Sequence, residues 1–332
     1  MFNDKSILIT GGTGSFGKAF IRELTKRYKP ERVVVYSRDE LKQFEMQQVF
    51  NGKCMRYFIG DVRDISRLNT GMTDVDYVVH AAALKQVPAA EYNPMECIKT
   101  NVLGAQNVID AAIANGVSKV IALSTDKAAN PVNLYGATKL CADKLFVAAN
   151  NIVGKKNTSF SVVRYGNVLG SRGSVVPIFR KLAREGAKAL PITDERMTRF
   201  WITLSQGVEF VMRTFSRMKG GEIFVPKIPS ARVADIARAV APGLPFEVIG
   251  VRPGEKMHEV MCPTDDSHLT LEFDGHYVIE PAITFRSVLD YSTDAEGAEG
   301  KRVPEGFEYN SGTNPRFLSG DEIHELCRVG GD

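Results

Sequence analysis

The sequence predicts an α/β fold built on a doubly wound parallel sheet, with a smaller C-terminal domain added to it. Short apolar runs alternate with amphipathic segments through the first half of the chain, which is typical of a parallel sheet covered by helices on both faces. A glycine-rich turn follows the first of these runs. The chain of 332 residues, 44% of them hydrophobic, is also long for one simple domain.

Composition excludes several classes of partner. The formal charge is +3, from 42 basic and 39 acidic residues, and no long run carries one sign. We therefore expect neither nucleic acid nor a membrane as the main partner. Five scattered cysteines predict reduced thiols and no metal site. No apolar run approaches a membrane span and the start leaves no room for a signal peptide, so we expect a cytoplasmic protein.

The predicted elements follow from periodicity and from turn residues. Strands are expected at 5–10, 32–36, 57–59, 77–80, 119–123 and 159–165. Helices are expected from the glycine turn to about residue 28, and at 91–116, 175–185 and 205–218. Asn101, within the second of these helices, is expected to tie a loop down. Residues 170–173 are predicted to form a loop, and residues 283–316, which lack apolar periodicity, a loop or mobile surface.

The glycine-rich turn has the spacing Gly-x-x-Gly-x-x-Gly. Glycines between a strand and a helix let the backbone approach a pyrophosphate, and the amides at the helix N-terminus favour that anion. A purely structural turn is the alternative, but the position after the first strand favours dinucleotide binding. The cofactor contacts expected from this turn are Gly11, Thr13, Gly14, Ser15, Phe16 and Gly17.

The end of the second strand bears on the choice of dinucleotide. A site for NAD would place an acid there to accept hydrogen bonds from the ribose hydroxyls. This chain has Ser37 and Arg38 instead, a hydroxyl and a guanidinium that suit a 2′-phosphate. Asp39 follows directly and leaves NAD open. We expect NADP.

Further cofactor contacts are expected where the third and fourth strands end. Asp61 and Val62 follow the third strand, and Asp61 could accept from the adenine amine or cap the next helix. Ala81 and Ala82 follow the fourth strand, and their small side chains would let a flat cofactor lie against the backbone. Lys85, just beyond, is either exposed or faces the cleft.

The stretch after the fifth strand carries the strongest chemical signal. Four polar residues, 124–127, end that strand, and Tyr135 and Lys139 follow on one face of a predicted helix. A cation beside the phenol lowers its pKa toward a useful range. A surface Tyr and Lys would be the alternative. Because the carboxyl ends of parallel strands share one rim with the glycine turn, a catalytic pair is favoured.

Together these motifs resemble the extended short-chain dehydrogenase/reductases. More specifically, Ser-Thr-Asp-Lys at 124–127 with Asn-Leu-Tyr-Gly-Ala-Thr-Lys at 133–139 is similar to the inverting UDP-N-acetylglucosamine 4,6-dehydratases, whereas retaining 4,6-dehydratases have Thr-Asp-Glu. The likeness extends over 164–172, 197–202 and 252–258. It implies an NADP-binding Rossmann domain at 1–166, with about 199–220 packing back on it, and a sugar-nucleotide domain over most of 167–332.

The resemblance also implies a reaction. Tyr135, assisted by Lys139 and Thr125, would take the C4 hydroxyl proton while hydride passes to NADP+. The new ketone makes the C5 proton acidic, so Lys127 without its own proton would abstract it. Asp126 in its acid form would then protonate the leaving C6 hydroxyl, and hydride would return to C6. The pKa of Lys127 would have to fall. An exposed ion pair between Asp126 and Lys127 is the alternative.

The substrate contacts implied by the resemblance, together with two arginines that could close on a UDP diphosphate, are Lys85, Thr125, Asn167, Val175, Arg199, Arg252 and Glu255. Such an enzyme would supply pseudaminic acid synthesis and flagellin glycosylation, and a homo-oligomer is expected. A UDP-sugar 4-epimerase of the same family and a non-catalytic NADP-binding regulator are the alternatives.

Overall fold

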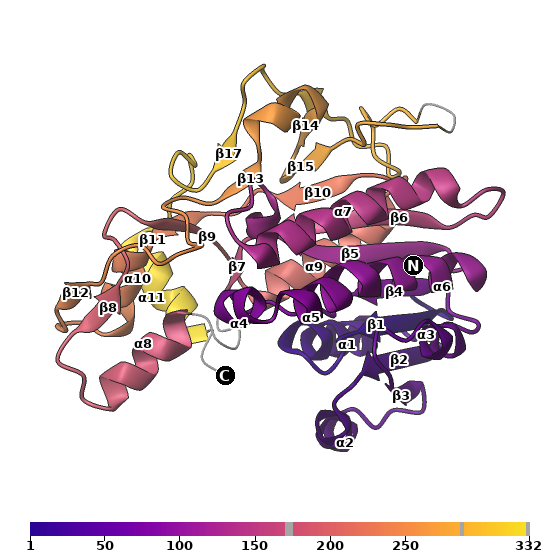
Figure 1. Cartoon of the computed structure of the whole chain (residues 1–332), viewed down its shortest axis with the longest axis horizontal. Coiled ribbons are helices and arrows are strands. Elements are labelled where there is room, and N and C mark those ends of the chain that lie inside the picture. The colour runs from indigo at the N-terminus through magenta and orange to yellow at the C-terminus, as the bar shows by residue number, and fades with distance from the viewer. Residues whose placement is uncertain (170–174, 286–288, 330–332) are drawn as a thin grey trace.

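A ten-stranded sheet forms the centre of the computed structural model, which describes residues 1–169, 175–285 and 289–329 (Figure 1). The strand order is β16-β14-β15-β10-β6-β5-β4-β1-β2-β3. The loop predicted at 170–173 lies outside the described residues. Within the described part of the chain, no helix is both long and apolar enough to span a membrane.

The strands from β3 to β10 in this order run parallel. Their bounds are β1 (Ser6–Thr10), β2 (Arg32–Ser37), β3 (Met55–Ile59), β4 (Tyr77–His80), β5 (Lys119–Thr125), β6 (Ser159–Tyr165) and β10 (Ile223–Pro226). Every residue of β1 is buried, because helices cover both faces of the sheet. Strand β5 runs two residues further than predicted, so Thr125 ends the strand.

Helices lie on both sides of the sheet, as predicted for a doubly wound α/β fold. Helices α1 and α9 contact each other, while α6 contacts α3 and α7. The helix predicted to pack back on the first domain is α9, which contacts β5 and β6. Their bounds are α1 (Ser15–Arg27), α2 (Glu40–Val49), α3 (Ile65–Gly71), α6 (Gly104–Ala114), α7 (Leu134–Ile152) and α9 (Leu204–Arg217).

The single helix predicted at 91–116 is wrong. The chain there forms α4 (Val87–Tyr92), α5 (Pro94–Ile98), a π-helical turn η1 (Lys99–Leu103) and α6. Pro94 breaks the helix because a proline disfavours helical backbone at the preceding residue, and Asn93 is correspondingly non-helical. The prediction for Asn101 is confirmed, since its side chain accepts from the Leu84 amide at 2.8 Å and donates to the Leu84 carbonyl at 2.9 Å.

The second half of the chain contributes to two regions. Three antiparallel strands extend the main sheet beyond β10: β14 (Thr270–Phe273), β15 (His276–Ile279) and β16 (Lys301–Arg302). Most other elements build a smaller part with its own apolar clusters. They are β7 (Asn167–Val168), α8 (Val175–Arg184), β8 (Leu190–Ile192), β9 (Thr198–Ile202), β11 (Ser230–Arg232), α10 (Val233–Val240), β12 (Phe246–Val248) and α11 (Gly320–Val329). The remaining elements, β13 (Val260–Cys262), η3 (Thr264–Leu269) and β17 (Tyr309–Asn310), pack on the main core. The division at residue 166 stays a prediction.

The segment 283–316 is more ordered than predicted in its described part. It supplies β16 and β17, and Tyr291, Val303 and Tyr309 are buried in the main core. The Tyr291 hydroxyl donates to the Gly220 carbonyl at 2.7 Å. A surface position is therefore wrong for these three residues, whose apolar side chains anchor the segment without any periodic pattern. Most of the described segment is loop, which was the other alternative.

Candidate active site

The glycine turn after β1 has the shape that a pyrophosphate requires. Gly11 has a φ of +66°, and a Cβ there would lie 2.9 Å from the Ala82 amide nitrogen. A Cβ on Gly17 would lie 2.3 Å from the Gly12 carbonyl oxygen. Gly14 caps α1 without a side-chain hydrogen bond, so the first amides of the helix are open to an anion. These residues fit a dinucleotide.

The end of β2 leaves a guanidinium available at this rim. The hydroxyls of Thr13 and Ser37 are hydrogen-bonded at 2.8 Å, which joins the glycine turn to β2. Asp39 caps α2 by accepting from the Lys42 amide at 2.9 Å, so its carboxylate is already engaged. The Arg38 side chain is 51% exposed and lies 3.4 Å from Asp61. Ser37 and Arg38 therefore lie at this rim, and the choice between NADP and NAD stays a prediction.

The two residues predicted after β3 differ in what they can offer a cofactor. Asp61 accepts from the Arg63 guanidinium at 2.7 Å. Burial would raise the pKa of Asp61, but Arg63 outweighs burial and lowers it. Asp64 rather than Asp61 caps α3, so the capping alternative is wrong. Val62 is buried, and its carbonyl accepts from Asn107.

The residues after β4 lie beside the glycine turn. The amides of Ala81 and Ala82 both donate to the Thr10 hydroxyl, at 3.2 and 3.3 Å. Lys85 is exposed, yet loss of solvation and then the like charge of Lys127 lower its pKa. The Lys85 amine therefore faces the same space as Lys127.

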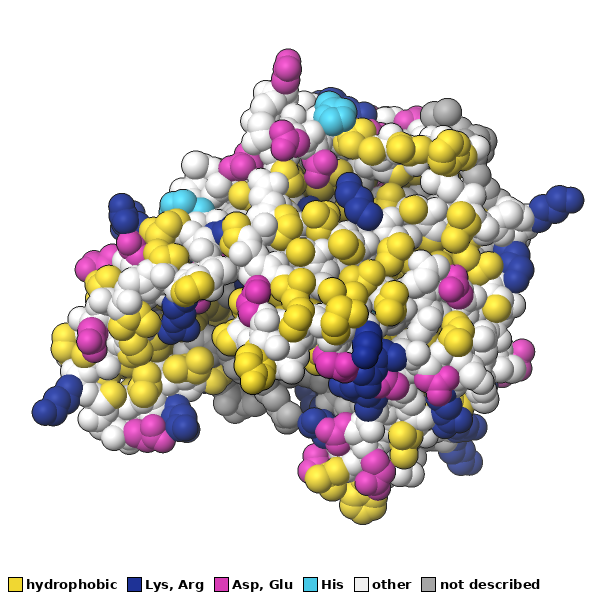
Figure 2. All heavy atoms as spheres, in the orientation of Figure 1, with side chains coloured by type: hydrophobic (Ala, Val, Ile, Leu, Met, Phe, Trp, Pro, Cys, Tyr) yellow, Lys and Arg dark blue, Asp and Glu magenta, His cyan; other side chains and the backbone are white. Residues whose placement is uncertain are grey.

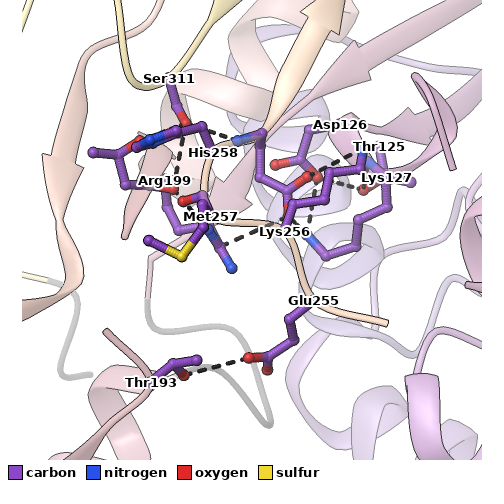
Figure 3. A network of polar contacts seen from close by, with 12 residues as sticks. Thr125, Asp126, Lys127, Thr193, Arg199, Glu255, Lys256, Met257, His258 and Ser311 are labelled. Carbon is purple, nitrogen blue, oxygen red and sulfur yellow. Dashed lines mark hydrogen bonds and ion pairs between the residues drawn. The ribbon is translucent and has the colours of Figure 1, made fainter. Parts of the chain in front are cut away.

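Strand β5 delivers Thr125 to the rim, and the one-turn helix η2 (Asp126–Ala128) follows it directly. One oxygen of the Asp126 carboxylate accepts from the Thr125 hydroxyl at 2.9 Å and from the Lys127 ammonium at 3.0 Å (Figure 3). Asp126 is fully buried, and the Lys127 side chain is 26% exposed. An exposed ion pair is therefore excluded. The other Asp126 oxygen is buried with no hydrogen bond to the described residues.

Tyr135 and Lys139 lie in the first two turns of α7, which Asn133 caps by accepting from the Gly136 amide. The Lys139 ammonium is buried and donates to the Leu123 carbonyl at 2.7 Å. Loss of solvation raises the pKa of Tyr135 to about 12. Lys127 and a hydrogen bond with Thr125 oppose that rise. The predicted net lowering of the Tyr135 pKa is wrong, because desolvation of the phenol outweighs the positive charge of Lys127.

The predicted fall in the pKa of Lys127 is also wrong. Burial would lower this pKa, but the carboxylates of Asp126 and Glu259 outweigh burial and raise it above the ordinary value for lysine. Glu259 lies 3.4 Å from the Lys127 ammonium. Lys127 is therefore charged in this structure, since two buried carboxylates face it.

The remaining predicted substrate residues lie in the smaller part of the molecule. Asn167, in β7, has a buried side-chain oxygen without a hydrogen bond to the described part of the chain, as a ligand contact would require. Val175 begins α8 and packs on apolar clusters. Glu255 accepts from the Thr193 hydroxyl at 3.3 Å and lies 3.8 Å from the Arg252 guanidinium.

The two predicted arginines are placed differently. Arg199 is buried in β9 and donates to the carbonyls of Thr198 and Met257. Its guanidinium lies close to Lys127 and Glu259. The Arg252 side chain is 60% exposed and pairs with Glu255. That both arginines bind one diphosphate stays a prediction.

Two charged residues of this site were missed from the sequence. Glu259 and Lys256 lie close to Lys127 and Arg199. A usable signal was present, because Glu259 is an acid directly before the apolar run that forms β13, where a buried charge needs partners. Among the described residues, no group of three or more His, Cys, Asp or Glu could hold a metal ion.

The doubly wound sheet, the glycine turn and the Tyr135–Lys139 pair at its carboxyl rim define an extended short-chain dehydrogenase/reductase. The chain belongs to the polysaccharide biosynthesis protein family, whose model matches residues 7–281. That match includes all the motifs on which the resemblance in sequence rests.

Individual relatives cover nearly the whole chain. An inverting UDP-N-acetylglucosamine 4,6-dehydratase of Campylobacter jejuni is 64% identical over 98% of both chains. A UDP-glucose 4-epimerase of Rickettsia felis is 40% identical, over 98% of this chain and 96% of that one. The X-ray structure of Pen from Bacillus thuringiensis superposes with a TM-score of 0.89 at 37% identity, covering 99% of this chain and 98% of that one.

Proposed function

We propose that this chain catalyses NADP-dependent 4,6-dehydration of UDP-N-acetylglucosamine with inversion at C5, giving a UDP-4-keto-6-deoxy-L-sugar. The observation that carries the proposal is the buried Asp126 carboxylate hydrogen-bonded to Lys127 beside Tyr135. An oxidation site alone needs Tyr135 and Lys139, whereas elimination of water also needs an acid and a base. The 64% identity to a relative named for this reaction supports the assignment.

The nicotinamide cofactor, when bound, supplies a hydride acceptor for C4 and later a hydride donor for C6. We propose that NADP is held by the turn at 11–17, by Ser37 and Arg38, and by the backbone near Ala81 and Ala82. Tyr135 would exchange the proton of the C4 hydroxyl. Thr125 would hold that oxygen, and Lys139 a ribose hydroxyl.

Asp126 and Lys127 would perform the elimination together. Moving one proton from the Lys127 ammonium to the Asp126 carboxylate, across 3.0 Å, gives a neutral amine and a carboxylic acid. The amine then takes the C5 proton, and the acid gives its proton to the departing C6 hydroxyl, which leaves as water. The pair ends with the charges it began with. When hydride has returned to C6, a proton delivered to C5 from the ring face opposite Lys127 completes the 4-keto-6-deoxy sugar with inversion. The raised pKa of Lys127 is compatible with this sequence because the proton stays within the pair.

We further propose that the UDP-sugar is bound by Asn167, Arg199, Arg252 and Glu255. The product would enter bacterial pseudaminic acid synthesis and flagellin glycosylation.

We also propose that the enzyme is a cytoplasmic homo-oligomer. Apolar side chains gather over α4, α5 and α7 on the face in Figure 2, and Tyr92, Met95 and Leu103 are exposed. Such a patch favours self-association.

Incubation with UDP-N-acetylglucosamine in D2O, followed by NMR, tests the reaction. We expect a 4-keto-6-deoxy product with deuterium at C5 and the L configuration there. A dehydrated product with the original C5 configuration would contradict inversion.

The 4-epimerase is the second candidate, favoured by the 40% identity to the Rickettsia relative. It needs no acid and base beside Tyr135, so Lys127→Ala should leave an epimerase active. Cofactor binding without any turnover would instead indicate a regulator.

A further inference from the structure

Glu259 is a buried carboxylate whose backbone is held in place beside the site. It immediately precedes β13 and is 2% exposed. Its amide donates to the Ser311 hydroxyl at 2.8 Å, and the Ser311 amide donates to its carbonyl at 2.8 Å. The neighbouring Met261 carbonyl accepts from the Arg164 guanidinium of β6 at 2.9 Å. Strand pairing and these bonds hold the Glu259 backbone in place.

The Glu259 carboxylate faces cations from three segments. One oxygen lies 3.4 Å from the Lys127 ammonium and 3.7 Å from the Arg199 guanidinium. The other oxygen lies 3.7 Å from the Lys256 ammonium and has no hydrogen bond to the described residues. A buried carboxylate with so few hydrogen bonds is costly unless nearby charges compensate it. The contacts of Glu259 are therefore electrostatic, and they converge on the proposed base.

We propose that Glu259 is a positioning residue that holds the Lys127 amine against Asp126 and supplies the second negative charge that keeps this amine protonated between turnovers. The proposal rests on the proposed function, in which Asp126 and Lys127 share one proton. Without Glu259, Lys127 would face a single carboxylate and three neighbouring cations.

The charges around Lys127 fix the direction of the effect. Asp126 and Glu259 face Lys127 and favour its ammonium form. Arg199, Lys85 and Lys256 also face it and disfavour that form. The remaining titratable neighbour is the Tyr135 phenol. Glu259→Gln removes one of the two favourable charges and keeps the side-chain volume. An opposite charge within about 4–6 Å shifts a pKa by about one unit or more, so Lys127 should lose its proton at lower pH.

NMR of protein labelled at lysine Cε tests this directly, with Lys127→Arg to assign the signal. In the wild type we expect the Lys127 signal of a charged amine up to the highest pH at which the protein stays folded. In Glu259→Gln we expect it to titrate at least about one pH unit lower. Glu259→Asp keeps the negative charge, so in this variant Lys127 should titrate close to the pH seen in the wild type. A Lys127 signal with the same pH dependence in the wild type and in Glu259→Gln would overturn the proposal.

Glu222→Gln is the matched control, because Glu222 is equally buried but is bonded to Ser161 and to the amides of residues 219 and 220. It should leave the Lys127 signal unchanged. Turnover gives an independent readout: Glu259→Gln should lower kcat with little change in KM and move the alkaline loss of activity to lower pH. If the wild type releases no water from UDP-N-acetylglucosamine, the proposed function fails, while the NMR titration still decides the role of Glu259.

Discussion

The Lys127 ammonium donates to the buried Asp126 carboxylate at 3.0 Å, so the proposed base and the proposed acid of the elimination form one hydrogen-bonded unit. At rest the pair is an ammonium and a carboxylate. Moving one proton from Lys127 to Asp126 gives the amine and the carboxylic acid that the elimination uses. Neither residue needs to exchange a proton with solvent before the reaction. Removing either one should therefore stop elimination without stopping oxidation at C4.

Lys127→Met tests that separation. The variant keeps the aliphatic stem and loses the amine, so we expect kcat for water loss to fall at least about 100-fold, the usual contribution of a general base. Oxidation at C4 depends on Tyr135 and should continue, so reduced cofactor should accumulate. Its absorbance after mixing with substrate measures this.

Lys119→Met is the control for this variant. Lys119 lies at the opposite end of the same strand, where its ammonium donates to the Phe215 carbonyl at 2.6 Å. Activity of Lys119→Met should stay close to that of the wild type. Unchanged dehydration by Lys127→Met would show that another group removes the C5 proton.

Arg38→Ala tests the choice of cofactor. Loss of a charge-assisted hydrogen bond to a 2′-phosphate is worth about 1.5–3 kcal/mol, so the Kd for NADP+ should rise at least about tenfold. The Kd for NAD+ should change little. Isothermal titration calorimetry with both dinucleotides measures the two constants. Arg63→Ala, which removes the other guanidinium bonded to Asp61, should alter neither constant. An equal loss for NAD+ and NADP+ would contradict a role for Arg38 at the 2′-phosphate.

Asn101→Ala should destabilise the fold. The variant leaves the Leu84 amide and carbonyl without partners and removes a 3.0 Å bond to Thr138, which lies between Tyr135 and Lys139. Each unsatisfied buried group costs about 1–3 kcal/mol, so we expect the free energy of unfolding to fall by at least about 2 kcal/mol. Denaturant unfolding measures the change. Gln106→Ala on α6 should stay within about 0.5 kcal/mol of the wild type. Equal stability of both variants would show that Asn101 does not anchor the loop.

Much of the rim was predictable because local sequence patterns specify it. The apolar runs and glycine spacing predicted the parallel sheet, and parallel strands bring their carboxyl ends together whatever the loops do. The break at Pro94 was missed because an apolar helical pattern continues on both sides of it.

The charge environment of the site was not predictable in the same way. Glu259 is more than 130 residues from Lys127 in sequence. The two come together because β13, which Glu259 precedes, pairs with β17 and contacts η2. The pKa shifts of Lys127 and Tyr135 depend on such long-range neighbours and on burial. A motif names the residue types but cannot give their ionisation.

His276 should make the fold sensitive to acid. Burial among Phe273, Phe224 and Phe210 lowers the pKa of His276 to about 4, from 6.5 for an ordinary histidine. The unfolded chain therefore binds a proton more readily than the folded chain. The stabilisation is fully present above pH 6.5 and is lost as pH falls toward 4.

His276→Phe removes this titration and keeps an aromatic ring in the pocket. The free energy of unfolding of the variant should fall less steeply than that of the wild type between pH 6.5 and 4. Some slope should remain, because burial also lowers the pKa of His80, to about 3. Urea unfolding at several pH values gives both slopes, and identical slopes would mean that His276 takes up no proton on unfolding.

Mass spectrometry of the sugar nucleotide after incubation of the wild-type protein with UDP-N-acetylglucosamine and NADP+ tests the central claim most directly. The geometry of Asp126, Lys127 and Tyr135 predicts a product lighter by one water, with no net consumption of cofactor. A sugar nucleotide of unchanged mass would contradict dehydration.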